Sequence, residues 1–314
     1  APCPQDCNTL GDRTNSFLGL AESNFNEVDE GIFHIFEAED CADLPRCFYN
    51  NPTSPYGMPI FPLAPREPNP DPLNISNRHP DREDLYGNYR LLSGEAIVWI
   101  GRTPPECPYF SFTAYVFSRH KPDSMGKPPY GDRALIFASV GESENQVTMK
   151  TSAAPGESPF SRESVVIMTA DRITDREIRE QLIHAGFAES IINTMVIPRF
   201  KADGMTPHVS MGFENENDVF SALMRIADPS ALVPGSPIRE WLDNTESRVF
   251  RIRRSSRARL DPLPMPPARP QGDGESESGA SVIQLVRSIQ ETHRDVGTQT
   301  RMAWPIEAAH GDYC

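Results

Sequence analysis

Hydrophobic positions are most concentrated in residues 95–119, where β-branched and aromatic side chains are densest. A short apolar run at residues 96–100 and an aromatic-rich run at residues 109–117 lie on either side of a proline-rich bend. Runs of this length between turn-forming residues predict buried strands rather than helices. The three phenylalanines of the second run cannot all share one face under strict alternation. We therefore expect this strand to be covered on both faces or to contain a bulge.

The same patterns predict further strands and helices along the chain. We expect strands at residues 134–140, 146–151, 164–169, 193–197, 205–213 and 248–254, and helices at residues 175–185, 218–227 and 237–242. In the last of these strands Phe250 and Ile252 alternate with arginines, which is the pattern of an edge strand. Residues 1–90 show little periodicity, apart from a short strand at 31–37 and helix-like spacing at 15–21.

Residues 164–197 carry the clearest supersecondary pattern, a strand, a helix and a second strand. Thr174 and Glu177 have the spacing of a capping box at the start of the helix. Gly186 followed by Phe187 is typical of a helix that ends in a left-handed glycine. Two strands joined in this way form a crossover unit if they are parallel in one sheet. The sequence therefore predicts an α+β or α/β fold with a mixed, largely β core sheet and a βαβ-like unit.

Changes in composition divide the chain into four parts. Residues 1–83 are rich in cysteine and proline and predict a coil-rich N-terminal wrap, and residues 84–259 contain the α/β core domain. A linker rich in proline, glycine and serine follows at residues 260–280. Residues 281–314 begin with apolar side chains at helical spacing, which predicts a C-terminal helix that docks on its own sheet or on another chain.

Composition narrows the possible classes of function. With 314 residues and 38% hydrophobic content, the chain is long enough to form a packed core. Its net charge of −14 argues against general binding to nucleic acids or to anionic membranes. No apolar run approaches the roughly twenty residues that a membrane-spanning helix needs. We expect a soluble globular protein with no membrane span, no nucleic-acid partner, and no metal or other cofactor.

The cysteines predict disulfides formed in an oxidising compartment, because four of the six lie within the first 47 residues. They are Cys3, Cys7, Cys41, Cys47, Cys107 and Cys314. A zinc site is the less favoured alternative, because the C-x3-C and C-x5-C spacings are not typical of zinc ligands. An Ala-Pro start like that of a chain trimmed of a signal peptide, and an N-glycosylation sequon at Asn74, agree with a secreted, extracellular glycoprotein.

Candidate catalytic residues are few. Asp171 and Arg172 follow the strand predicted at residues 164–169, where α/β proteins bind ligands, although an Asp before a helix is equally explained as its N-terminal lead-in. His208 stands in a single His-x-Ser motif, and a polar residue on an edge strand is the simpler interpretation. A secreted hydrolase with a site near these three residues is the alternative function.

An arginine cluster near the end of the core domain is the strongest charge feature. Its members are Arg248, Arg251, Arg253, Arg254, Arg257 and Arg259. In an acidic chain such a cluster could neutralise the acidic N-terminal third, bind a protein partner or another copy, or grip a sulfated or phosphorylated polymer. We expect one of the first two roles. The sequence thus favours a secreted, non-catalytic binding or assembly protein with contacts through this edge and the C-terminal helix, and it leaves enzymatic activity open.

Overall fold

The computed structural model describes residues 9–36, 55–68, 79, 82–121, 132–255 and 259–267. Contacts within the chain divide it into two units, residues 1–266 with Cys314 and residues 267–313. All helices and strands reported below belong to the first unit. The predicted C-terminal helix and tail, residues 281–314, and most of the predicted linker lie outside the described residues.

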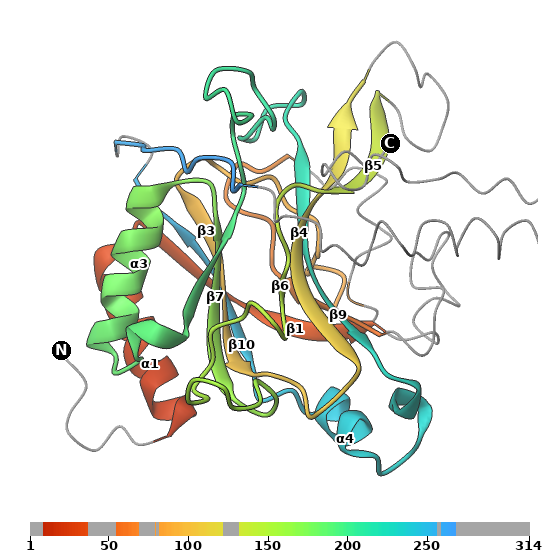
Figure 1. The fold of residues 1–314 in the computed structure, drawn as a ribbon. Helices are drawn as coiled ribbons and strands as arrows, with labels where there is room; N and C mark the ends of the chain where they lie inside the picture. Colours follow the sequence, from red (N-terminus) through yellow and green to blue (C-terminus); the bar gives the residue numbers. More distant parts are fainter. Residues whose placement is uncertain are drawn as a thin grey trace, which may run out of the picture. The chain divides into compact units, whose positions relative to one another are not determined.

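The first unit is a mixed α+β fold built on a ten-stranded sheet that curls into a half-barrel (Figure 1). The strands are β1 (Glu27–Phe36), β2 (Tyr56–Ile60), β3 (Glu95–Arg102), β4 (Tyr109–His120), β5 (Arg133–Ser139), β6 (Glu144–Asn145), β7 (Glu163–Thr169), β8 (Ile192–Val196), β9 (Val219–Ala227) and β10 (Arg248–Arg253). The sheet order is β5-β4-β9-β2-β1-β10-β3-β7-β8, with β6 paired to β4. Only β7 and β8 pair in parallel among these strands. The predicted α+β class with a largely β core is confirmed.

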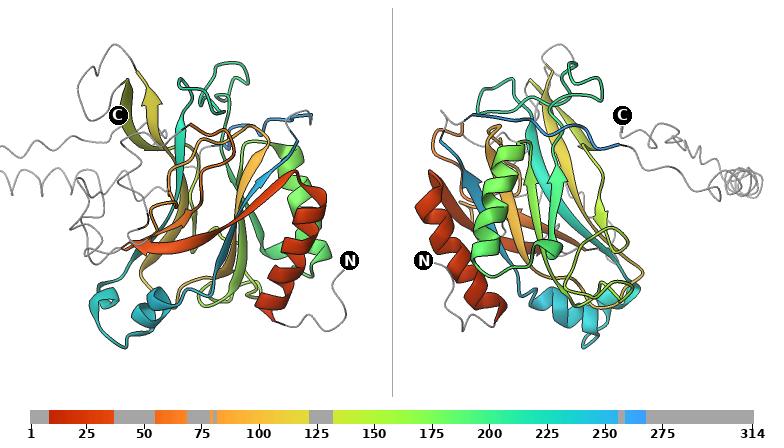
Figure 2. Two further views of the ribbon diagram at one scale, coloured as in Figure 1. Left: turned by 180° about the vertical axis from the view of Figure 1, so that it is seen from behind. Right: turned by 60° about the vertical axis from the view of Figure 1, so that its left-hand side comes forward.

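Helices cover the outer face of one part of the sheet. The described α-helices are α1 (Leu10–Asn24), α3 (Arg172–His184) and α4 (Pro237–Asp243), and short 3-10 turns lie at η3 (Glu189–Ile191) and η4 (Pro229–Leu232). Helices α1 and α3 lie side by side against β10, β3 and β7 (Figure 2). Phe17 of α1 packs edge-on against Phe250 of β10, with ring centroids 5.6 Å apart. Ile178 and Leu182 of α3 are fully buried in the same cluster.

The curl brings strands that are distant in the sheet order face to face. Strands β3 and β4 are separated by four others, yet the rings of Trp99 and Phe112 lie 4.8 Å apart across the interior. A large cluster of buried apolar side chains from both ends of the sheet fills this interior. Strand β4 is buried on both faces along most of its length, and its register shifts around Phe117, so both features expected of this strand occur.

Residues 140–150 lie across the gap between β4 and β8. Val140 N donates to Ala114 O of β4 at 3.0 Å. At the other end, Lys150 N donates to Asn193 Oδ1 of β8 at 2.7 Å. This segment therefore links the two sides of the half-barrel, and the predicted strand at residues 146–151 is wrong. The chain turns there instead, because Asn145 Oδ1 accepts a hydrogen bond from Val147 N at 2.9 Å.

The βαβ-like unit is confirmed, with a different start to its helix. Asp171 is the N-cap residue of α3, and its Oδ2 accepts hydrogen bonds from the backbone N and the hydroxyl of Thr174, both at 2.8 Å. The predicted capping box at Thr174 is therefore wrong. The predicted helix end is confirmed: Gly186 has φ +95°, and Phe187 N donates to Leu182 O at 3.0 Å, as in a Schellman motif.

The described part of the N-terminal region contributes a helix and two strands to the fold. Strands β1 and β2 lie between β9 and β10, and α1 packs on the outer face. The sequence pattern is weak here because β1 buries only two of its ten residues, Phe33 and Phe36. The described part of the predicted wrap is thus a helix and two strands of the same fold.

Two further predicted elements are wrong for local reasons. The helix expected at residues 218–227 is β9, whose faces are both buried, so its apolar residues do not alternate and resemble a helical stripe. The strand expected at residues 205–213 is irregular backbone with bends, and Pro207 forms an isolated bridge with Phe200. Asp203 Oδ1 accepts hydrogen bonds from the backbone N of Met205 and of Thr206, both at 2.8 Å, so the chain turns directly before the residues that bond back to Arg199 and Lys201.

Candidate functional site

The arginine-bearing strand β10 lies inside the sheet, between β1 and β3, so it is not the predicted edge strand. Its predicted alternation is confirmed, because Phe250 and Ile252 face the helices whereas Val249 belongs to the interior cluster. Residues two apart in a strand share a face, so Arg251 and Arg253 share the interior face with Val249. Both arginines are buried, and they do not form an exposed basic edge.

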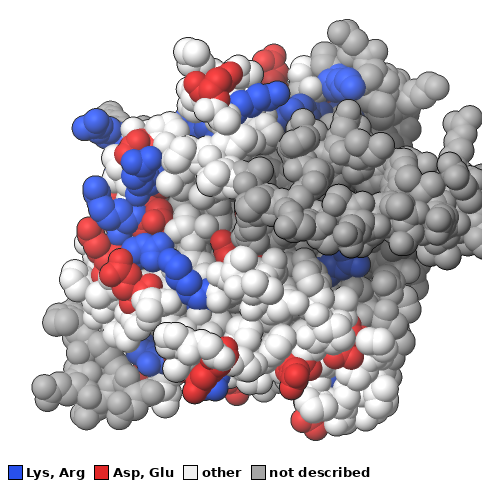
Figure 3. Space-filling model, viewed as in Figure 1, with Lys and Arg blue, Asp and Glu red and all other residues white. Residues whose placement is uncertain are grey.

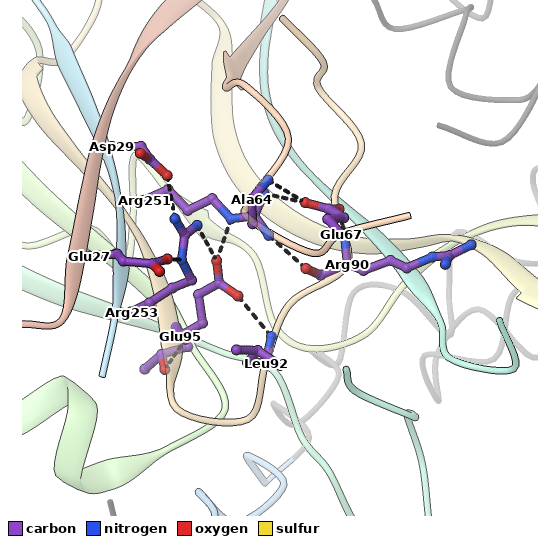
Figure 4. A network of polar contacts seen from close by, with 10 residues as sticks. Glu27, Asp29, Ala64, Glu67, Arg90, Leu92, Glu95, Arg251 and Arg253 are labelled. Carbon is purple, nitrogen blue, oxygen red and sulfur yellow. Dashed lines mark hydrogen bonds and ion pairs between the residues drawn. The ribbon is translucent and has the colours of Figure 1, made fainter. Parts of the chain in front are cut away.

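Arg251 lies at the centre of a buried polar network (Figure 4). Its Nε donates to Glu95, its Nη1 donates to Glu67 Oε2 at 2.8 Å, and its Nη2 donates to Arg90 O at 2.7 Å. Burial alone would lower the pKa of Arg251, but the carboxylates of Glu95 and Glu67 raise it above its usual value. The network therefore holds a permanently charged guanidinium between two buried carboxylates.

Arg253 extends this network to strand β1. Its Nε donates to Glu27, its Nη2 donates to Asp29 Oδ2 at 2.6 Å, and its Nη1 lies 3.4 Å from Glu95 Oε1. Burial would lower the pKa of Arg253, whereas Glu95 and Asp29 raise it, and the pKa is raised on balance. Glu95 also accepts a hydrogen bond from Leu92 N at 2.8 Å, so both of its oxygens are engaged.

The other described members of the arginine cluster also bind groups of their own chain. Arg248 Nε donates to Glu30 at 2.6 Å, and Arg254 Nε lies 2.7 Å from Glu177 of α3. The backbone oxygen of Arg259 accepts a hydrogen bond from Arg254 Nη1 at 3.0 Å. Arg257 lies outside the described residues.

These contacts match the first of the three roles expected for the arginines, neutralisation of the acidic N-terminal third. Four partner carboxylates, those of Glu27, Asp29, Glu30 and Glu67, come from the first 83 residues. The exposed charges near α3 are likewise mixed, with acidic and basic side chains interspersed on that side of the molecule (Figure 3). The network therefore joins the N-terminal segments to β3 and β10.

Sequence reasoning missed the two central carboxylates of the network. Glu95 stands at the start of the densest apolar run, and a charge at that position could have indicated a buried partner. Glu67 lies in a proline-rich segment with no pattern to mark it.

The three candidate catalytic residues have different surroundings. Asp171 is buried and caps α3, whereas the side chain of Arg172 is exposed and lies 3.8 Å from Asp261. His208 lies between β8 and β9, where its backbone N donates to Arg199 O at 2.9 Å. The contacts described for Asp171 and for His208 involve different residues, so they do not support one site built from the three.

Residues 259–266, which we call the strap, lie along the residues that directly follow β7. Leu263 N donates to Ala170 O at 2.9 Å, and Arg172 N donates to Asp261 O at 2.8 Å. Asp261 N in turn donates to Asp171 Oδ1. Both carboxylate oxygens of Asp171 are therefore occupied, one by the strap and the other by the start of α3. The first part of the predicted linker is thus packed on the core.

Cys107 is a free thiol in the structure, in contrast to the disulfide expected there. Burial, aided by the charge of Asp228, raises the pKa of the Cys107 thiol to about 11. Cys3, Cys7, Cys41, Cys47 and Cys314 lie outside the described residues, as does the sequon at Asn74. The disulfides and the glycosylation therefore stay predictions.

No group of three or more His, Cys, Asp or Glu side chains in the described ranges is arranged to hold a metal ion. None of the helices in those ranges is long and apolar enough to cross a membrane.

Comparison with known proteins gives no relative for this fold. No family model matches the chain, and no curated protein and no solved structure is significantly similar to it.

Proposed function

We propose that this chain is a non-catalytic binding or assembly protein. The observation that carries the proposal is the strap at the carboxyl end of β7. An α/β enzyme commonly holds its ligand at this position, but here the strap occupies it and Asp171 serves as a helix cap. A group with both oxygens engaged in holding the fold is poorly placed for acid–base chemistry.

The packed interior of the half-barrel supports the same proposal. Curled sheets of this kind bind small molecules when their interior is hollow. Here aromatic side chains such as Trp99, Phe110, Phe112 and Phe220 are buried in the interior cluster. A filled interior favours contacts made by the outside of the molecule.

The hydrolase alternative has less support. It requires Asp171, Arg172 and His208 to act together, whereas their described contacts lie with different groups. A specific hydrolytic activity lost on replacement of His208 by Ala would restore this alternative.

The surface used for association is proposed to lie in the C-terminal part of the chain. The described contacts of Arg248, Arg251, Arg253 and Arg254 lie within the chain, so we assign association to the predicted C-terminal helix, which begins at Ser281, instead. An amphipathic helix joined through a linker gains a high effective concentration at a neighbouring surface.

Light scattering of the full chain and of a variant ending at Pro266 tests this proposal. We expect the full chain to have the mass of an assembly, and the shortened variant to be a folded monomer that keeps its strap. A monomeric full chain at working concentration, or a shortened variant that unfolds, would contradict the assembly proposal. Circular dichroism of both samples separates loss of association from loss of fold.

We also propose that the protein is secreted, since the cysteine pattern favours an oxidising compartment. Mass spectrometry of the protein, with and without reduction, tests for disulfides among the cysteines other than Cys107.

A further inference from the structure

Residues 199–208 form a hairpin-like loop between β8 and β9. His208 N donates to Arg199 O at 2.9 Å, and Lys201 N donates to Thr206 O at 2.8 Å. These hydrogen bonds join the two arms of the loop. The loop therefore has a defined backbone, and the residues between Lys201 and Thr206 form its tip.

Asp203 fixes the backbone at this tip. Its Oδ1 accepts a hydrogen bond from Met205 N at 2.8 Å, and its Oδ2 accepts one from the Thr206 hydroxyl. The hydrogen bond from the Thr206 hydroxyl, and after it those from the backbone N of Thr206 and Met205, lower the pKa of Asp203 below its usual value. The carboxylate therefore stays charged at neutral pH and holds Met205 through its backbone.

Met205 differs in exposure from the other methionines of the described ranges. It is 80% exposed. The others are buried or partly buried: Met58, Met149, Met168, Met195, Met211, Met224 and Met265. A dissolved reagent can reach the thioether of Met205 in the folded protein, whereas it reaches a buried thioether only when the fold opens.

We propose that Met205 is a site of reversible oxidation, with a peroxide as the oxidant. The thioether sulfur attacks one oxygen of hydrogen peroxide, the S–O bond forms as the O–O bond breaks, and the other oxygen leaves as water. The sulfur loses two electrons and the peroxide gains them, so the product is methionine sulfoxide. A methionine sulfoxide reductase returns the thioether, as two thiols are oxidised to a disulfide and the oxygen leaves as water.

The position of Met205 allows the fold to tolerate this change. A sulfoxide is polar and disrupts a packed core when it forms there, but at an exposed tip the added oxygen stays hydrated. The hydrogen bond between Met205 and Asp203 uses the backbone N of Met205, which oxidation does not alter. The inference does not depend on the proposed binding function.

Treatment of the full chain with hydrogen peroxide, followed by peptide mass spectrometry, measures the oxidation rate of each methionine. In the folded chain we expect Met205 to be oxidised at least about tenfold faster than Met168 and Met224, because these two are at most 1% exposed. In urea, where all three are exposed, their rates should lie within about threefold of one another. The unfolded sample separates the effect of exposure from that of local sequence.

Matched variants test the site and its tolerance. Met205→Leu should remove the fast oxidation and leave the rates of Met168 and Met224 unchanged. Met205→Gln places a polar group at the tip and should keep the urea midpoint of the unchanged chain. Met224→Gln places the same group in the interior cluster and should lower the midpoint or prevent folding. Incubation of the oxidised chain with a methionine sulfoxide reductase and dithiothreitol should restore Met205.

Oxidation of Met205 in the folded chain no faster than that of Met224 would overturn the inference, as would a Met205 sulfoxide that the reductase does not reduce. A lower urea midpoint for the chain oxidised at Met205 alone would also overturn it, because the side chain would then contribute to packing.

Discussion

Replacing Arg251 with methionine removes the cation at the centre of the buried network while keeping a side chain of similar length. Glu95 and Glu67 then lose their shared charged partner, and Arg90 O loses a donor. The side chains of both glutamates are buried, with at most 3% exposed, so water cannot replace the lost bonds without opening the core. The perturbation therefore leaves negative charge inside the protein.

The size of the expected loss of stability depends on the contacts that Glu67 and Glu95 keep in the variant. Removing one partner of a buried ion pair costs about 3–5 kcal/mol. Glu67 keeps hydrogen bonds from Ala64 N at 2.9 Å and Arg90 N at 2.7 Å, and Glu95 keeps Arg253 at 3.4 Å. These contacts offset part of the penalty, so we expect a loss near the lower end, about 3 kcal/mol.

Urea unfolding followed by tryptophan fluorescence measures this loss. Arg176→Met is the matched control, because Arg176 is exposed and lies 3.8 Å from Glu180 on the surface of α3. That variant should lose at most about 0.5 kcal/mol. A loss below about 1 kcal/mol, no larger than that of the control, would refute the reasoning that the network is buried and coupled.

Three further predictions follow from individual residues. Gly186→Ala should destabilise by about 1 kcal/mol because Gly186 has φ +95°, whereas Gly19→Ala inside α1 should stabilise slightly, and urea unfolding of both distinguishes the signs. Alkylation of Cys107, followed by mass spectrometry, should be slow in the folded protein. Because burial raises the pKa of the Cys107 thiol to about 11, the rate should keep increasing up to about pH 11. A rate that reaches a plateau near pH 9 would contradict this prediction. A thiol assay on the denatured, unreduced protein should find Cys107 and at most about one other thiol, and six thiols would remove the disulfide prediction.

Several strands could be predicted because their local pattern agrees with their final environment. The apolar run at residues 96–100 and the aromatic run at 109–117 became β3 and β4, since buried strands need such side chains wherever they lie in a sheet. The sequence did not indicate that four other strands lie between these two in the sheet, or that the two meet across the interior. A side-chain contact between strands that are not neighbours in the sheet depends on the curl of the whole sheet.

The candidate site was less accessible from sequence. The alternation in residues 248–254 predicted that Arg251 and Arg253 share one face of a strand. It did not indicate whether that face is exposed to solvent or buried. A strand of alternating apolar and charged residues has the same sequence pattern at the edge and in the centre of a sheet, when carboxylates from other segments neutralise its charges. Here Glu67 and Glu95 do so, and they lie more than 150 residues away in the chain.

The sequence by itself determined features that depend on near neighbours: the end of α3 at Gly186, the short helix α4, and the apolar runs of β3, β4 and β7. These features arise from backbone conformations and burial preferences that a few adjacent residues set. Only the tertiary structure decided the position of β10 within the sheet and the pairing of its arginines. Burial and charge neutralisation depend on segments brought together from distant parts of the chain, and no local pattern records which segments those are.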